Sequence, residues 1–221
     1  MDPERLQAYL HSLEPDTSPL LREMEAHAAE QRIPIVRKET AAFLKTLVAL
    51  KNPREILEIG TAIGYSALRM CEALRGDGHL TTIEKWEKRI PEARENFRRA
   101  GELHRITLLT GDAAEVLRAL AGPYDFIFLD AAKGQYLALL PELERLTAPG
   151  GVLVTDNIFQ DGTILESRYA VRRRDRTIHA RLREYLYQLK HRREWETALV
   201  PVGDGVAVSV RKRETSEETS I

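Results

Sequence analysis

Apolar residues recur three and four positions apart through the first fifty residues, which is the spacing of one face of an α-helix. Prolines interrupt this pattern twice, at Pro15 and at Pro34. The pattern therefore predicts three helices: one before Pro15, one over Pro19–Gln31, and one after Pro34. We expect residues 1–50 to form a helical cover on the part of the chain that follows.

From Glu55 onward, short apolar runs rich in β-branched residues alternate with amphipathic stretches. The five apolar runs are Ile56–Ile59, Leu80–Ile83, Ile106–Leu109, Phe126–Leu129 and Val152–Thr155. The helical patterns lie at Tyr65–Leu74, Pro91–Ala100, Ala113–Leu120 and Tyr136–Leu146. Strands that alternate with helices in this way form a mostly parallel sheet with helices on both faces, the α/β class.

The last third of the chain changes pattern. Periodicity predicts a long polar helix over roughly Ile164–Lys190. Two further apolar runs, Thr197–Val202 and Val206–Val210, flank the turn Gly203-Asp204-Gly205. An Asp-Gly turn between apolar runs is typical of a β-hairpin, so the parallel sheet is expected to end in a C-terminal antiparallel pair.

Composition and charge narrow the class of protein. The 221 residues are 43% hydrophobic and 30% charged, which is typical of a globular domain. We expect that domain over residues 1–211 and a charged, disordered tail at 212–221. With a formal net charge of −1, the protein as a whole does not attract nucleic acid, so a nucleic-acid partner would have to bind to a local basic patch. One cysteine, Cys71, and an N-terminus without a long apolar run favour a cytoplasmic protein with no membrane association.

Glycines follow the first predicted strand at a spacing suited to a cofactor other than a dinucleotide. The strand ends in Glu58-Ile59-Gly60, and Gly64 follows, so the fingerprint G-x-G-x-x-G is not met and a nicotinamide enzyme is disfavoured. Glycines here allow a ligand to approach the backbone closely. The Glu58 carboxylate would repel a pyrophosphate but attract a cationic sulfonium and an ammonium group.

Acidic residues follow the second and third predicted strands. Glu84 ends the second strand, where an acid can accept both hydroxyls of a ribose. Gly111-Asp112-Ala113 follows the third strand, where an adenine edge can be bound. Taken singly, each feature is equally well explained as a turn or a solvated strand end. Their occurrence at consecutive strand ends favours a nucleoside-containing cofactor.

Polar residues also end the fourth and fifth predicted strands, at Asp130 and at Asp156-Asn157. In a parallel sheet these ends open into one crevice, and two carboxylates with an amide oxygen suit Mg²⁺ better than Zn²⁺. Lys133 lies close by, and a neighbouring metal and cationic cofactor would disfavour its charged form, so that it could take a proton from an acceptor hydroxyl. The alternative is that Asp130 caps a helix, Asp156-Asn157 forms an Asx turn and Lys133 is an ordinary surface lysine.

These residues resemble the cation-dependent O-methyltransferases, the family of the catechol and caffeoyl-coenzyme A methyltransferases. The similar segments are Ile35-Val36-Arg37-Lys38-Glu39, Glu58-Ile59-Gly60, Gly64-Tyr65-Ser66, Leu129-Asp130-Ala131-Ala132-Lys133 and Asp156-Asn157. The resemblance implies the Rossmann-like, seven-stranded sheet of class I S-adenosylmethionine-dependent methyltransferases, usually as a homodimer. It implies Lys133 as the general base and Mg²⁺ or a similar ion at Asp130, Asp156 and Asn157. It also implies S-adenosylmethionine contacts at Val36, Glu58, Gly60, Tyr65, Ser66, Glu84, Asp112, Ala113 and Asp130.

Within that family, three segments look like the bacterial branch that methylates 5-hydroxyuridine in the anticodon loop of tRNA to 5-methoxyuridine. These segments are 131–136, 157–162 and 201–205. Ala131 and Ala132 stand where the catechol enzymes carry bulky residues, which leaves the pocket floor open. A further acidic contact of the catechol enzymes has no clear match. The alternative acceptor is a small catechol-like or caffeoyl-CoA-like molecule.

A basic stretch lies between Arg168 and Arg193, where ten basic residues outnumber two acidic ones for a local net charge of +8 with histidine neutral. Tyr169, Tyr185 and Tyr187 are interleaved with them. Such a strip can hold an RNA backbone, and the predicted RNA contacts are Arg37, Lys38, Arg172, Arg173, Arg174 and Arg176. The alternatives are a solvated helix face, a dimer interface, a site for a phosphate-bearing small acceptor, or a non-catalytic RNA-binding protein.

Overall fold

A seven-stranded sheet organises the chain, of which the structure, a computed structural model, describes residues 3–213. The strand order is β3-β2-β1-β4-β5-β7-β6. The parallel strands are β1 (Glu55–Ile59), β2 (His79–Glu84), β3 (Ile106–Thr110), β4 (Tyr124–Leu129) and β5 (Thr147–Thr155). The antiparallel strands are β6 (Trp195–Val200) and β7 (Val206–Arg211), and β7 pairs with both β5 and β6. The predicted mixed sheet and its C-terminal hairpin are confirmed.

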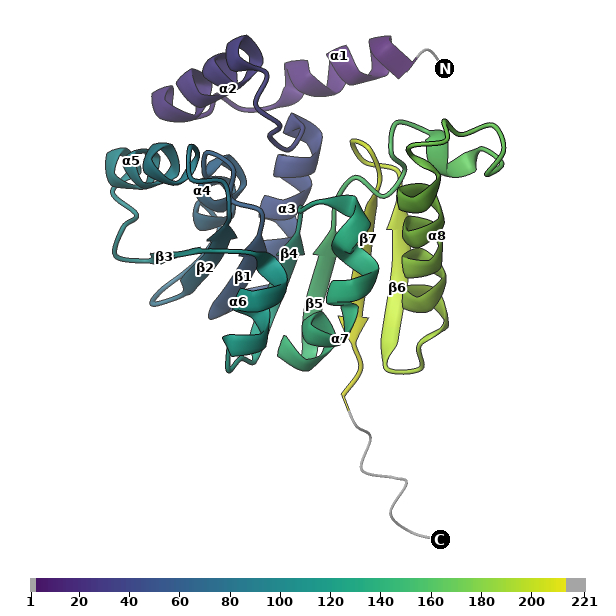
Figure 1. Ribbon diagram of the computed structural model, residues 1–221. Coiled ribbons are helices and arrows are strands. Elements are labelled where there is room, and N and C mark those ends of the chain that lie inside the picture. Colours follow the sequence, from purple (N-terminus) through teal and green to yellow (C-terminus); the bar gives the residue numbers. More distant parts are fainter. Residues whose placement is uncertain (1–2, 214–221) are drawn as a thin grey trace, which may run out of the picture.

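Helices cover both faces of this sheet (Figure 1). One face carries α3 (Lys38–Lys51), α4 (Tyr65–Cys71) and α5 (Ile90–Ala100). The other carries α6 (Ala113–Ala119), α7 (Tyr136–Leu146) and α8 (Arg176–His191). On β4, Phe126 and Phe128 pack in the first core, whereas Ile127 and Leu129 pack in the second, because successive strand residues point to opposite faces. Both faces of the strands are therefore buried, which explains their continuous apolar runs.

The N-terminal helices α1 (Pro3–Leu13) and α2 (Pro19–Gln31) lie across one end of the sheet, at the top of Figure 1. Ser18 caps α2, because its Oγ accepts a hydrogen bond of 3.3 Å from the Leu21 N–H. Glu25 ties α2 to the body of the protein: it accepts a 2.6 Å hydrogen bond from the Tyr65 hydroxyl and lies 2.8 Å from Lys38 Nζ. Three helices therefore lie in the first 51 residues, as the periodicity predicts, with α1 and α2 across the end of the sheet.

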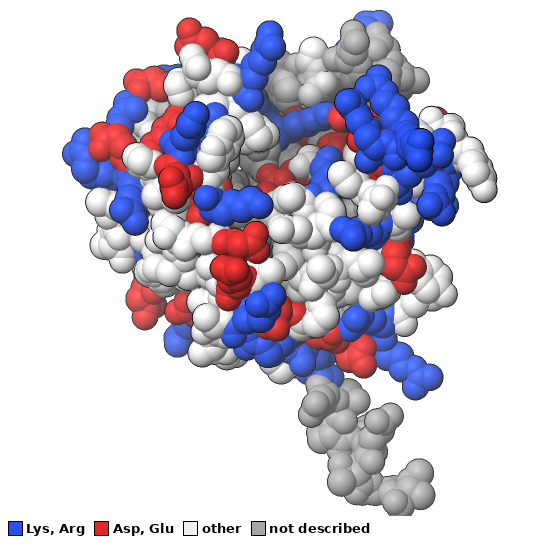
Figure 2. Space-filling view, in the orientation of Figure 1, with Lys and Arg blue, Asp and Glu red and all other residues white. Residues whose placement is uncertain are grey.

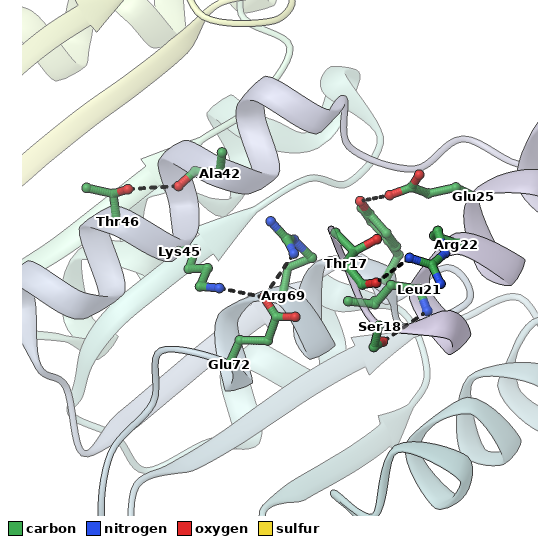
Figure 3. A network of polar contacts seen from close by, with 11 residues as sticks. Thr17, Ser18, Leu21, Arg22, Glu25, Ala42, Lys45, Thr46, Arg69 and Glu72 are labelled. Carbon is green, nitrogen blue, oxygen red and sulfur yellow. Dashed lines mark hydrogen bonds and ion pairs between the residues drawn. The ribbon is translucent and has the colours of Figure 1, made fainter. Parts of the chain in front are cut away.

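Polar contacts also join the helices beneath this cover (Figure 3). Lys45 of α3 and Arg69 of α4 both donate to Glu72 Oε2 at 2.9 Å. Arg69 is buried, so this shared carboxylate supplies the countercharge that a buried guanidinium needs. The contacts hold α3 against α4, the helix that starts directly after the glycine turn.

The predicted helix over Ile164–Lys190 is wrong in its first half. A short 3-10 turn, η2 (Thr163–Leu165), is followed by turns over residues 166–175, and α8 begins only at Arg176. Side chains of α8 satisfy carbonyls in the turns: Arg176 Nε donates to Val171 O at 3.1 Å, and His179 Nε2 lies 3.2 Å from the Glu166 carbonyl oxygen. These contacts replace the backbone bonds that a continuous helix would have made.

The last strand, β7, ends at Arg211, and Lys212 N beyond it donates to Glu194 O at 2.8 Å. The rest of the predicted tail, residues 214–221, lies outside the described residues. Between residues 3 and 213, no helix is long and apolar enough to cross a membrane. The homodimer stays a prediction.

Candidate active site

The carboxyl ends of three neighbouring strands meet at one edge of the sheet. Asp130 N donates to Ile59 O at 2.9 Å, and Asp156 N donates to Leu129 O at 3.0 Å, which keeps the chain segments side by side just beyond β1, β4 and β5. Gly60 has a φ of +107°, and a Cβ there would lie 2.0 Å from the Asp130 carbonyl oxygen. Only glycine permits this approach, so the glycine turn forms part of the floor of the site.

A cavity of about 510 Å³ opens at this edge, a size suited to a nucleoside-sized ligand. The predicted site residues that line it are Gly60, Glu84, Ala113, Asp130, Lys133 and Asn157. Sequence reasoning missed the other walls, which include Ile33 and Pro34 of the α2–α3 linker. It also missed Trp86, whose ring centroid lies 4.9 Å from the Arg89 guanidinium, because no motif marks these positions.

Backbone groups fix the Glu84 carboxylate in this cavity. Its Oε2 accepts from Ala62 N at 2.8 Å, and its Oε1 accepts from Lys85 N at 2.9 Å and from Trp86 N at 2.8 Å. A carboxylate held this firmly is preorganised to accept the hydroxyls of a ribose. Asp112, in contrast, caps α6 through a 3.0 Å bond from Ala114 N to its Oδ1.

Four predicted cofactor residues are buried and lie outside the lining of the cavity: Val36, Glu58, Tyr65 and Ser66. Glu58 accepts hydrogen bonds from Ser66 Oγ at 2.5 Å and from Thr82 Oγ1 at 2.6 Å. Burial raises the pKa of Glu58 to about 8, although these two bonds oppose the rise. The direct contact of these four residues with a cofactor stays a prediction.

Asp130 and Asp156 bring two carboxyl groups to this edge, of which Asp156 is buried and Asp130 is half-buried in the lining of the cavity. Burial raises the pKa of Asp130 to about 7 and that of Asp156 to about 6, and the negative charge of Asp156 adds to the rise at Asp130. Asp156 Oδ1 is buried and has no hydrogen-bond partner among the described residues. Asn157 follows with a φ of +56° and lines the cavity. The structure therefore brings the three predicted metal ligands to one edge.

Lys133 faces the same space as this acidic pair. Its positive charge lowers the pKa of both Asp130 and Asp156, in opposition to the larger effect of burial. Lys133 Nζ also lies 3.6 Å from Oδ2 of Asp204, which the sequence placed only in a hairpin turn. β7 runs antiparallel to β5, so the turn before β7 lies at the carboxyl end of β5, beside Asp156.

The predicted RNA contacts fall into two groups. Arg172, Arg173 and Arg174 are exposed on the turns before α8, whereas the other candidates make internal contacts. Arg37 Nη2 lies 3.3 Å from Asp161 Oδ1, Lys38 pairs with Glu25, and Arg176 donates to the carbonyls of Tyr169 and Val171. The structure therefore gathers the exposed arginines on one segment and uses Lys38 and Arg176 to hold the fold.

The comparisons with known proteins agree with this geometry. Residues 11–212 match the sequence model of the O-methyltransferase family. A catechol O-methyltransferase of Mycobacterium tuberculosis is 32% identical over 74% of this chain and 76% of that protein. A catechol O-methyltransferase of Niastella koreensis is 39% identical over 56% of this chain, and the match spans 58% of that protein's length. The O-methyltransferase from Bacillus cereus, solved in complex with SAH, superimposes with a TM-score of 0.84 at 26% identity over 94% of this chain and 97% of that one. The chain thus belongs to the family of S-adenosylmethionine-dependent O-methyltransferases.

Proposed function

We propose that this O-methyltransferase uses a divalent cation, Mg²⁺ or a similar ion, and methylates a hydroxyl group that has a second oxygen atom beside it on the acceptor. The observation that carries the proposal is the Asp130–Asp156 pair. The two carboxyls have raised pKa values, and Asp156 Oδ1 is buried without a hydrogen-bond partner in the described part of the chain, so a cation would stabilise the site.

The ligand chemistry fits this cation. Two carboxylates and the Asn157 amide supply hard oxygen atoms and leave positions open for the acceptor. Within the described residues, no group of three or more His, Cys, Asp or Glu side chains is placed to hold a metal ion, so the proposed site rests on two carboxylates and one amide. When bound, the cation would supply Lewis-acid chemistry, lowering the pKa of the acceptor hydroxyl and fixing its direction.

The chain's own residues would supply the remaining steps. Lys133 would act from its uncharged form, which a neighbouring cation and the cationic cofactor favour: its amine takes the proton of the acceptor hydroxyl, and the electron pair stays on the acceptor oxygen. Glu84 holds the ribose of S-adenosylmethionine, and the close approach at Gly60 lets the donor lie along the strand ends. The acceptor oxygen then attacks the methyl carbon as the bond from carbon to sulfur breaks. Catalysis on this account depends mainly on positioning.

Comparing two acceptors tests the requirement for paired oxygens. With labelled S-adenosylmethionine and Mg²⁺, we expect methyl transfer to catechol to be at least about 100-fold faster than to phenol, because phenol cannot offer two oxygens to the metal. Product formation is followed by chromatography. Equal rates on the two acceptors would contradict the proposal.

A second acceptor, 5-hydroxyuridine in tRNA, is favoured by the surface beside the site. Its 5-hydroxyl and 4-carbonyl oxygens meet the same chemical requirement. Lys and Arg side chains gather at the upper right of Figure 2, over the turns before α8. These turns, residues 166–175, we call the arginine segment. Its exposed cations are Arg168, Arg172, Arg173 and Arg174, and Tyr169 among them is 86% exposed. Exposed arginines with an interleaved aromatic ring suit an RNA backbone and an unstacked base.

Removing positive charge from the arginine segment distinguishes between the two candidate acceptors, tRNA and a catechol-like molecule. The triple variant Arg172→Gln, Arg173→Gln, Arg174→Gln is expected to reduce the slope of log tRNA affinity against log salt by up to about three, since each lost phosphate contact removes about 0.9. Catechol methylation is expected to stay unchanged. The control replaces three exposed arginines elsewhere: Arg75, Arg94 and Arg118. An unchanged tRNA slope in the first variant would leave the small, catechol-like acceptor as the substrate class.

A further inference from the structure

Asp204 is a buried carboxylate at the tip of the β6–β7 hairpin, with 7% of its surface exposed. The hairpin tip is bound to the loop that follows the predicted metal ligands. Asp204 Oδ1 accepts a 2.7 Å hydrogen bond from Asp161 N, and its carbonyl oxygen accepts a 2.9 Å bond from Phe159 N. Gly205 O accepts a further bond of 3.1 Å from Ile158 N. These bonds fix the Asp204 carboxylate in place.

The second oxygen of this carboxylate is directed to Lys133. Oδ2 lies 3.6 Å from Lys133 Nζ, and the Lys133 side chain is 26% exposed, so the pair is only partly screened by water. Lysine has a long, flexible stem, and Lys133 starts the short 3-10 turn η1 (Lys133–Gln135) rather than a long helix. Within the described residues, Asp204 provides the carboxylate in ion-pair range of Nζ. The Asp204 carboxylate therefore restricts the orientations that the Lys133 side chain can adopt.

We propose that Asp204 is a positioning residue for Lys133, which holds Nζ beside the acceptor and stabilises the ammonium that forms when Lys133 takes the acceptor's proton. The inference rests on the proposed function of Lys133. In the step concerned, the O–H bond of the acceptor breaks, an N–H bond forms at Nζ, and the electron pair stays on the acceptor oxygen. A fixed carboxylate beside the new cation lowers its energy, as the aspartate of a serine-protease triad does for its histidine.

The two oxygens of Asp204 allow the positioning role to be separated from a structural one. Oδ1 holds the loop by accepting a hydrogen bond from Asp161 N, whereas Oδ2 forms the ion pair with Lys133. In Asp204→Asn, the amide oxygen can still accept from Asp161 N, but the negative charge beside Lys133 is lost. A purely structural residue would tolerate this change, and a positioning residue would not.

The test measures kcat and KM of the full chain with catechol, S-adenosylmethionine and Mg²⁺. Asp204→Asn is expected to lower kcat by about 10- to 100-fold, the usual loss when a group that orients a functional side chain is changed. The KM for S-adenosylmethionine and the thermal midpoint are expected to stay unchanged. Asp204→Glu, which keeps the charge, is expected to retain more of kcat than Asp204→Asn. The double variant Lys133→Met, Asp204→Asn is expected to be no slower than Lys133→Met alone.

Rates are expressed per S-adenosylmethionine-binding site, measured by calorimetry, so that unfolded protein does not enter kcat. Asp77→Asn is the matched control, because it removes an exposed carboxylate from the turn before β2, at the opposite edge of the sheet. A wild-type kcat in Asp204→Asn, no advantage of Asp204→Glu over Asp204→Asn, or losses that multiply in the double variant would each overturn the proposal. A wild-type kcat in Lys133→Met would instead overturn the proposed function of Lys133, and the role of Asp204 with it.

Discussion

Replacing Lys133 with Met is expected to lower kcat for catechol methylation by about 10²- to 10⁴-fold, the usual contribution of a general base. Methionine keeps most of the length and the apolar stem of lysine but cannot accept a proton. S-adenosylmethionine should still bind, because Glu84, Gly60 and the walls of the cavity are unchanged. Steady-state kinetics with labelled S-adenosylmethionine give kcat, and calorimetry gives the affinity for the cofactor.

Lys212→Met provides a control for the Lys133 experiment. Lys212 is exposed at the far end of β7 and pairs only weakly with Glu196, at 3.6 Å. Its replacement removes the same charge and is expected to leave kcat unchanged. If Lys133→Met instead kept a wild-type kcat, the acceptor would lose its proton by a route without Lys133.

The second large effect is expected at the acidic pair. Asp156→Asn keeps the shape of the side chain but removes a charge that the cation needs. We expect kcat to fall on the order of 10³-fold, since a bound cation supplies several kcal/mol of charge stabilisation. Calorimetric titration with Mg²⁺ should show binding to the wild-type protein and none to the variant at the same concentrations. Metal binding by the variant as tight as that of the wild type would remove Asp156 from the ligand set.

Asp156→Asn is expected to lower activity but not to lower the stability of the metal-free protein. The pKa of Asp156 is raised in the folded protein to about 6, so its proton binds more tightly there than in the unfolded chain. Its contribution to stability is therefore lost as pH rises from about 4 to about 6 and is absent at pH 8. At pH 8, metal-free Asp156→Asn is expected to unfold at a temperature no lower than that of metal-free wild type. Mg²⁺ should raise the midpoint of the wild type alone.

Much of the fold was predictable because its strongest signals are local. The continuous apolar runs of β1 and β4 arise from burial on both faces, and the glycine turn is a backbone requirement. The convergence of Asp130 with Asp156 was also predictable, since parallel strands bring their carboxyl ends to one edge. These features follow from local sequence patterns and from the parallel strand arrangement that such patterns predict.

The missed features depend on tertiary contacts. The start of α8 was misplaced because arginine is a good helix former, and nothing local shows that Arg176 and His179 contact carbonyls of the preceding turns. Asp204 was read only as part of a hairpin turn. Its place beside Lys133 depends on the pairing of β7 with β5, which is a property of the strand order rather than of the turn itself.

Methyl transfer by this protein is proposed to require a divalent cation at Asp130, Asp156 and Asn157. The most direct test is transfer of labelled methyl from S-adenosylmethionine to catechol by protein treated with EDTA and freed of chelator, with Mg²⁺ then added back. We predict that the treated protein is inactive, that Mg²⁺ restores the wild-type rate, and that the same ionic strength of NaCl does not. Full activity in metal-free protein, with the absence of metal verified by elemental analysis, would contradict the account.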